Sequence, residues 1–430
     1  MAESWIAHTP GGAVVVRRVD GELVVDLPRD EVFRAPLTPI EPPPTDFRRH
    51  VGWYAVGDRT VLVTQYPEPF FGEPMLMCCD GDAVTRLYPV ADGTLMGEDG
   101  SVLDLSKVVR SSAYVEHDFG TGTLILPTGP GPHAVAIQVH GAAIVSRDFN
   151  RLFAQPFLDA GIGVYVYDKA PEGTIFSWAD GVEAAIDQLA ASPLVDAARV
   201  GLAGFSNGMW SVPIVAARRE VAFIAGIGAP GVSMAGSETH RRIKLLRDAG
   251  VSAESAEVVG TAWRLVFAIA GAGSATPEQT AQLSAALAAV TRLPDLDRYV
   301  APEYVRNNPM LSPLPPSYDA GELIGFLTGP GDPELNHDPA ADYAQLRCPI
   351  YLQYGEFDTS VPVADSVARI SAANLAVAVS VYPGLEHMLN RLPATLPAAL
   401  AGTSIGGFHG FRFGEGVRAD LTAWLKKNVS

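Results

Sequence analysis

A serine at the centre of a short glycine-flanked motif is the strongest candidate for chemistry in this chain. The pentapeptide Gly204-Phe205-Ser206-Asn207-Gly208 follows an apolar run at Arg199–Ala203 and precedes a helix-like segment that starts at Met209. A chain that reverses between a buried strand and a helix strains the serine backbone, and the glycines remove side chains that would clash. The following helix points its first N–H groups at the reaction centre. This pattern predicts that Ser206 is a nucleophile.

A serine hydroxyl is a poor nucleophile at neutral pH, so it needs a base and a carboxylate that orients the base. The chain supplies both after Ser206, in the order Asp358 and then His387, each shortly after a predicted strand. Glu356 is the alternative to Asp358, but it lies nearer the strand end, and the turn position favours Asp358. We therefore predict a triad in which His387 takes the proton of Ser206 and Asp358 fixes the histidine tautomer.

An oxyanion hole needs backbone N–H groups that point at the developing negative charge. One donor is expected to be Asn207, directly after the nucleophile. The second is expected in His140-Gly141-Ala142-Ala143, the loop after the apolar run Ala134–Val139. Ala142 is the first choice and Ala143 the next. We interpret His140 as a structural, hydrogen-bonded residue.

Strands and helices alternate through the part of the chain that carries these residues. The period-3.6 pattern of Trp178–Ala191 predicts an amphipathic helix, and Arg418–Lys427 predicts a final one. Alternation of this kind predicts an α/β fold with a mostly parallel central sheet flanked by helices. The expected strands are residues 112–116, 122–126, 134–139, 162–167, 199–203, 222–227, 349–354 and 376–382.

Residues 1–108 are expected to form a β-rich N-terminal accessory domain, ahead of a catalytic domain at 109–430. Short β-branched runs and turn-forming Asp-Gly pairs favour antiparallel strands. The five prolines between Pro36 and Pro44 are interpreted as an extended connection. The strands are predicted at residues 13–19, 22–27, 60–65, 74–79 and 83–88.

The strand rhythm stops at about residue 231 and returns at about 344. Helical patterns fill much of this interval, at residues 240–249, 252–270 and 277–291. An insertion of this size between strands predicts a helical cap that borders the site. Its apolar residues, such as Trp263, Leu265 and Phe267, can pack in a core or line an acyl pocket, and core packing is the simpler expectation.

Composition narrows the function classes. The 430 residues are 48% hydrophobic and 18% charged, which supplies a sizeable core. The net charge of -17 disfavours nucleic acid and anionic membranes as partners. The sequence shows no secretory signal and no membrane-spanning segment.

The cysteines and the other metal-ligating residue types give a second set of expectations. Cys78, Cys79 and Cys348 are expected to be reduced, which favours a cytoplasmic location. Because no His, Cys and Asp cluster has ligand spacing, neither a metal nor a cofactor is expected.

The stretch from His140 to His387 resembles the α/β-hydrolase superfamily, and in particular the branch near prolyl oligopeptidases, dienelactone hydrolases and acyl-CoA thioesterases. Three motifs carry the narrower resemblance: His140-Gly141 followed by Ser146-Arg147-Asp148, then Tyr167-Asp168-Lys169, and Pro213 within the predicted helix that follows Ser206. The segment from Cys348-Pro349 to Val361-Pro362 is similar to the acid-bearing strand and loop of these enzymes. Two departures are Ala142-Ala143 in place of Gly or Ser, and Ala170-Pro171-Glu172-Gly173 in place of an Arg-Gly-x-Gly run.

The resemblance implies a serine hydrolase that cleaves an ester, lactone or thioester of a small or medium acyl substrate. A peptidase or amidase and an acyltransferase use the same triad, so they stay as alternatives. A hydrolase fold that only binds is the non-enzyme alternative, and it would be indicated by loss of a triad member. The first 108 residues are too few for the β-propeller of prolyl oligopeptidases, since each blade needs roughly 40–50 residues. The sequence leaves the acyl group, the leaving group and homo-oligomerisation open.

Overall fold

The computed structural model describes most of the chain from residue 47 onward, together with the backbone of four strands before it. The described residues are 47–66, 75–90, 94–97, 101–142, 146–248, 250–293, 320–391 and 411–429, with strands at 4–9, 12–19, 22–24 and 37–40. Residues 294–319, which include a proline-rich stretch at 308–316, therefore lie outside the described residues.

The chain forms two compact units, each assembled from separated segments. The first comprises Met1–Pro171, Ala185–Ala203 and Leu389–Ser430, and the second comprises Glu172–Ala184 and Gly204–Met388. These units do not follow the expected division at residue 108, and the domain boundaries remain a prediction. All three residues of the predicted triad belong to the second unit.

The first four strands form an antiparallel sheet of their own, in the order β3-β2-β1-β4. The strand β4 lies within the proline-rich stretch that we interpreted as a connection, so that interpretation was wrong at residues 37–40. Its Pro39 is paired with Trp5 of β1, and proline is tolerated there because β4 is an edge strand. The strands are β1 (Ser4–Thr9), β2 (Gly12–Val19), β3 (Glu22–Val24) and β4 (Leu37–Ile40).

A second antiparallel sheet has seven strands in the order β10-β9-β8-β7-β6-β5-β11. One face of it is apolar, and Tyr54, Val63 and Leu76 are buried there in a common cluster with Leu87. After the short helix η1 (Arg48–His50), its strands are β5 (Gly52–Val56), β6 (Arg59–Tyr66), β7 (Met75–Asp80), β8 (Ala83–Pro89), β9 (Leu95–Gly97), β10 (Val102–Leu103) and β11 (Val109–Arg110).

The largest sheet has eight strands in the order β12-β13-β15-β14-β16-β17-β18-β19. The strand β13 runs antiparallel to both β12 and β15, whereas β14 with β15, β17 with β18, and β18 with β19 are parallel. The expected mostly parallel sheet is therefore confirmed. Its strands are β12 (Tyr114–Asp118), β13 (Gly122–Pro127), β14 (His133–Val139), β15 (Gly163–Tyr167), β16 (Val195–Phe205), β17 (Ile224–Ile227), β18 (Ile350–Gly355) and β19 (Val377–Tyr382).

Helices alternate with the strands of this sheet, and a local side chain caps the start of some of them. The side chain of Ser146 accepts a hydrogen bond from the amide of Asp148 and so caps α2. Pro213 lies inside α5, the helix that follows Ser206, as expected from the sequence. The helices are α2 (Arg147–Asn150), η3 (Arg151–Phe153), α3 (Gln155–Asp159), α4 (Ile175–Ala190), α5 (Gly208–Arg218), α11 (Pro339–Tyr343), α12 (Val363–Ala373) and α13 (Val417–Asn428).

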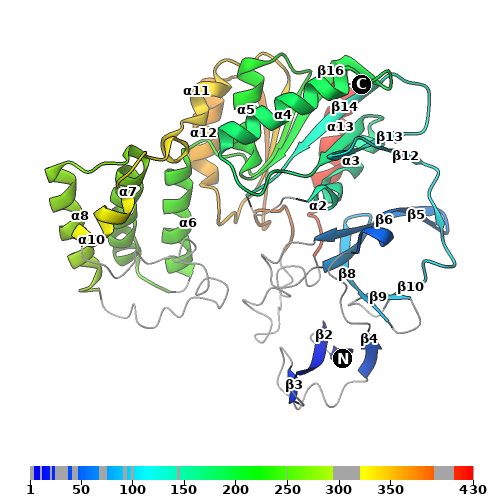
Figure 1. Ribbon diagram of the computed structural model, residues 1–430, viewed down its shortest axis with the longest axis horizontal. Helices are drawn as coiled ribbons and strands as arrows, with labels where there is room; N and C mark the ends of the chain where they lie inside the picture. Colours follow the sequence, from blue (N-terminus) through cyan, green and yellow to red (C-terminus); the bar gives the residue numbers. More distant parts are fainter. Residues whose placement is uncertain are drawn as a thin grey trace. The chain divides into compact units, whose positions relative to one another are not determined.

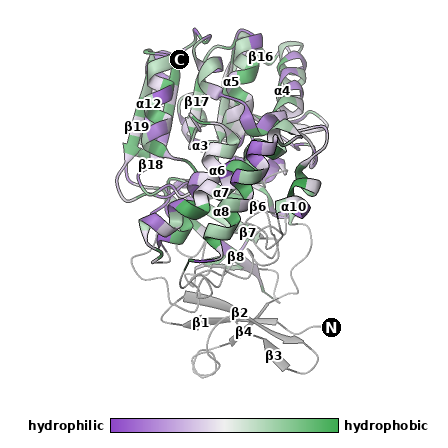
Figure 2. Cartoon of the chain, turned by 90° about the vertical axis from the view of Figure 1, so that its left-hand side faces the viewer, coloured by the Kyte–Doolittle hydropathy of each residue, from purple (hydrophilic) through white to green (hydrophobic). Residues whose placement is uncertain are grey.

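The insertion between β17 and β18 is helical in its described residues, and its helices α6, α7, α8 and α10 lie side by side (Figure 1). Hydrophobic and hydrophilic residues alternate around α7 and α8 (Figure 2), because the helices bury one face in a shared core. The side chains of Trp263 and Phe267 lie in this core. The elements are α6 (Met234–Asp248), α7 (Ala253–Ala272), α8 (Pro277–Val290), α10 (Ala320–Leu327) and η6 (Pro333–Asn336).

Candidate active site

Ser206 occupies a strained turn between β16 and α5. Its backbone has φ +52°, one of two positive values among the described non-glycine residues, and such a conformation costs of order 1–3 kcal/mol. The turn is held by hydrogen bonds from the Ser206 amide to the Ile227 carbonyl, at 2.9 Å, and from the Met209 amide to the Ser206 carbonyl, at 2.8 Å. At Gly204 an added Cβ would collide with the Met209 side chain. The sequence therefore places the glycine where a side chain is excluded.

The imidazole of His387 connects the serine to a carboxylate. Its Nε2 lies 2.8 Å from Oγ of Ser206, and its Nδ1 lies 2.7 Å from Oδ2 of Asp358. When Nδ1 carries the proton, it donates to Asp358 and leaves Nε2 to accept from the serine hydroxyl. The structure thus brings together the three residues that the sequence singled out, in one hydrogen-bonded chain.

Asp358 is held as a carboxylate by its neighbours. Burial raises the pKa of Asp358, but hydrogen bonding and charge from His387, together with backbone amides, outweigh it and hold that pKa below its usual range. The amides are those of Ser360 and Val361, which donate to Oδ1 at 2.8 and 2.9 Å. The alternative acid, Glu356, is exposed and accepts from a different backbone amide. Of the two acids, Asp358 is therefore the one that contacts the histidine.

Asn207 follows the serine at the start of α5. It is buried, and among the described residues none accepts a hydrogen bond from its backbone N–H. An unengaged N–H at a helix N-terminus is suited to bind negative charge. This is the arrangement that the predicted oxyanion donor requires.

The second predicted oxyanion donor, Ala142, is exposed and belongs to the first unit. The ammonium of Lys169 holds its loop by donating to the carbonyls of Gly141, at 2.7 Å, and Ala142, at 3.2 Å. Ala143, the next choice, lies outside the described residues. The assignment of Ala142 stays a prediction.

His140, directly after β14, is buried in the first unit and hydrogen-bonded through one of its two ring nitrogens. Its Nε2 donates to the Tyr167 carbonyl at 2.6 Å, and the ring is buried. Burial, with the nearby charge of Lys169, lowers the pKa of His140 to about 3. The residue is therefore a neutral structural histidine at ordinary pH.

Two residues near the triad were not singled out by the sequence. The ring of Phe205, directly before the serine, lies 5.1 Å from the His387 ring, centroid to centroid. Gly228, directly after β17, approaches the same imidazole closely. A glycine at the end of a predicted strand was the available signal for Gly228, but nothing local indicates which ring it faces.

The helical insertion is tied to the rest of the second unit at its two ends. The indole N–H of Trp210 in α5 donates to the Val232 carbonyl at 3.1 Å, and the Ile175 amide donates to Glu334 at 2.8 Å. Within α6, burial lowers the pKa of the partly buried His240, and the negative charge of Asp358 partly offsets this effect. The helix α6 therefore lies within electrostatic range of the triad.

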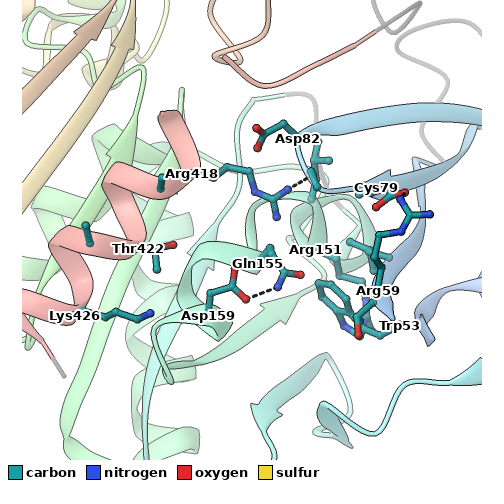
Figure 3. A pocket seen from close by; sticks show the side chains of 17 residues that line it. Trp53, Arg59, Cys79, Asp82, Arg151, Gln155, Asp159, Arg418, Thr422 and Lys426 are labelled. Carbon is teal, nitrogen blue, oxygen red and sulfur yellow. Dashed lines mark hydrogen bonds and ion pairs between the residues drawn. The ribbon is translucent and has the colours of Figure 1, made fainter. Parts of the chain in front are cut away.

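A separate pocket of about 740 Å³ lies in the first unit. Figure 3 shows it between α13 on one side and the strands that carry Trp53, Arg59 and Cys79 on the other. Arg59 pairs with Asp80, and Arg418 donates to a backbone carbonyl. The pocket is lined by both basic and acidic side chains, so it does not favour a ligand of one charge.

Searches for two other kinds of feature give nothing within the described ranges. No group of three or more His, Cys, Asp or Glu side chains there could hold a metal ion. None of the helices described is long and apolar enough to cross a membrane.

No protein-family model matches the chain, and no curated protein matches it either. Solved structures do. An esterase from Pyrococcus furiosus is 16% identical with a TM-score of 0.41, over 74% of this chain and 92% of that one. The 2,6-dihydroxy-pseudo-oxynicotine hydrolase is 16% identical, with a TM-score of 0.38, over 74% and 67%. A proline iminopeptidase from Mycobacterium smegmatis is 15% identical, with a TM-score of 0.39, over 73% and 98%.

The architecture of the chain can be named from its own geometry. The large sheet is mostly parallel, a strained serine joins β16 to α5, and an acid and a histidine follow in that order after β18 and β19. A nucleophile at a strand-to-helix turn, with acid and histidine later in the chain, is characteristic of one fold. This protein has the α/β-hydrolase fold that the sequence predicted.

Proposed function

We propose that this protein is a serine hydrolase that cleaves an ester, lactone or thioester of a small or medium acyl substrate. The observation that carries the proposal is the continuous hydrogen-bonded chain from Ser206 through His387 to Asp358. The strained backbone of Ser206 supports it as well, because strain of this kind is stored at functional sites.

The geometry supports a two-step acyl transfer. As the Ser206 oxygen attacks the substrate carbonyl carbon, its proton moves to Nε2 of His387, which then gives it to the leaving group. The ester bond breaks and an acyl-serine forms. In the second step, water gives a proton to Nε2 as its oxygen attacks the acyl carbon. The bond from that carbon to Oγ of Ser206 then breaks, Nε2 returns the proton to Oγ, and the acid is released.

Charge is stabilised at two points during these steps. The carboxylate of Asp358 stabilises the imidazolium that forms on His387. The Asn207 N–H is placed at the start of a helix, where it can donate to the oxyanion of each tetrahedral intermediate. A single lost oxyanion donor costs roughly 10²–10³-fold in kcat in enzymes of this kind, so one such donor is a substantial part of the proposed catalysis. No step needs a metal or a cofactor.

Esters are ranked above amides because the first 108 residues are too few for the β-propeller of prolyl oligopeptidases. The peptidase or amidase and the acyltransferase remain second candidates, since they use the same triad. The reaction is proposed for a small-molecule acyl substrate in the cytoplasm, without nucleic acid or membrane as a partner.

The test is turnover of a p-nitrophenyl ester series from acetate to decanoate, run beside the matched anilides and an acyl-thioester of the same chain length. We expect ester and thioester cleavage with a maximum at short or medium chains. Faster cleavage of the anilides would instead support an amidase. If the wild-type protein cleaved none of them, and no acyl group accumulated on Ser206, the hydrolase proposal would be wrong.

A further inference from the structure

Gly228 lies directly after β17, against the imidazole ring of His387. A Cβ atom added at this glycine would lie 2.8 Å from Cε1 and 3.0 Å from Nδ1 of the ring. Carbon atoms that are not bonded prefer separations of about 3.5–4.0 Å. A methyl group in this position would therefore overlap the ring, and only a hydrogen atom fits.

The ring has little freedom to move away from such a group. Its Nε2 is hydrogen-bonded to Oγ of Ser206 at 2.8 Å, and its Nδ1 to Oδ2 of Asp358 at 2.7 Å. The Phe205 ring lies beside it. The added Cβ would also lie 3.5 Å from Oδ2 of Asp358. Any tilt that relieves the overlap therefore lengthens a hydrogen bond of the triad.

Gly228 is itself held in place. Its amide donates to the Gln353 carbonyl of β18 at 2.9 Å, and its φ is +59°. The sheet therefore fixes the glycine on one side, while the triad fixes the imidazole on the other.

We infer that Gly228 is a positioning residue for His387: its missing side chain leaves the space in which the imidazole can bridge Ser206 and Asp358. The inference deepens the proposed serine hydrolase function and rests on it for its kinetic consequence. The structural part, a direct contact between position 228 and the ring, can be tested without turnover.

The kinetic test compares Gly228→Ala with Gly57→Ala. Gly57, between β5 and β6, has a similar φ of +62° but no other heavy atom within 4 Å of its added Cβ, so it carries the backbone cost without the collision. A misplacement of about 1 Å can cost roughly 10²-fold in rate, and we expect Gly228→Ala to lower kcat by about that factor with KM little changed. Gly57→Ala should keep the wild-type kcat. An equal loss in both variants would show that backbone strain, and not the contact, is responsible.

The second test measures melting temperatures in the wild-type and His387→Ala backgrounds. Because His387→Ala removes the ring, Gly228→Ala should lower the melting temperature less in that background than in the wild type. Gly57→Ala should lower it equally in both. If Gly228→Ala alone does not fold, the double variant Gly228→Ala/His387→Ala should recover folding.

Equal melting shifts of Gly228→Ala in the two backgrounds, or failure of the double variant to recover, would overturn the inference. This readout does not use activity. A protein that hydrolysed no substrate would contradict the proposed function, yet it would still report whether position 228 touches the ring.

Discussion

Nδ1 of His387 lies 2.7 Å from Oδ2 of Asp358. Glu356, only two residues earlier, is exposed and accepts a hydrogen bond from the Gly384 amide at 3.0 Å. The two acids thus have separate tasks: Asp358 holds the histidine, and Glu356 fixes the loop that carries it. Asp358 also accepts two backbone amides at its other oxygen, so it is oriented before any substrate binds.

Replacement of Asp358 by asparagine should therefore damage catalysis far more than the fold. An amide in place of the carboxylate favours the wrong histidine tautomer, and kcat is expected to fall by about 10³–10⁴-fold. Steady-state kinetics on the best ester of the chain-length series would measure it. The control is Glu356→Gln, which should leave kcat close to the wild-type value. A more severe loss in Glu356→Gln than in Asp358→Asn would reverse the roles of the two acids.

His140 should make the protein less stable in acid. Its folded-state pKa is about 3, against about 6.5 for a free histidine, so between these values the unfolded chain binds a proton that the folded chain does not. The stability contribution is complete above pH 6.5 and falls as pH decreases, by about 1.4 kcal/mol per pH unit for one proton.

The measurement is the free energy of unfolding from pH 7 to pH 4, for the wild type and His140→Gln. The variant should show a shallower acid loss, because glutamine has no proton to gain. If His140→Gln kept the wild-type slope, His140 would not be the group responsible.

Substitution in α6 should change which substrates are accepted. The negative charge of Asp358 acts on the pKa of His240 in this helix. If the helical insertion is a cap, His240 borders the bound acyl group. We expect His240→Leu to shift the chain-length preference by about 10-fold in kcat/KM, the size of effect that a small change in an apolar pocket produces. Labelling by a small fluorophosphonate should change much less.

The matched control for this cap prediction is Arg264→Gln on α7. Arg264 is half exposed and pairs with Glu257, so its loss should leave the substrate profile unchanged. A cap that does not border the site would give identical profiles for both variants. In that case the apolar residues of the insertion, such as Trp263 and Phe267, would serve only to form its own core.

The sequence was sufficient to single out the three residues that form the hydrogen-bonded chain, because each is marked by a local pattern. Ser206 lies in a glycine-flanked turn after an apolar run, and Asp358 and His387 each follow a predicted strand. The carboxyl ends of parallel strands lie at one edge of the sheet. Residues that directly follow these strands are therefore expected to lie close together. The helices and strands of the large sheet were likewise visible from their periodicity, with ends displaced by a few residues.

What the sequence could not supply are the contacts between distant segments. Gly228 is one glycine among 42, and only the folded chain shows that it faces His387. The strand β4 was hidden by its prolines, since pairing with β1 at an edge overrides their low strand propensity. The start of α6 at Met234, earlier than predicted, follows from packing in the helical bundle rather than from a strong local pattern.

The most direct test of the central claim is covalent labelling of Ser206 by a fluorophosphonate, read by mass spectrometry of the intact protein and of its peptides. We predict one adduct per wild-type chain, on the peptide that contains Ser206, and none in Ser206→Ala, whose kcat should also fall by roughly 10⁴-fold or more. Ser211→Ala, at a buried serine of α5 whose hydroxyl donates to the Ile175 carbonyl, should still be labelled. An adduct that persists in Ser206→Ala, or no adduct in the wild type, would contradict the assignment of Ser206 as the nucleophile.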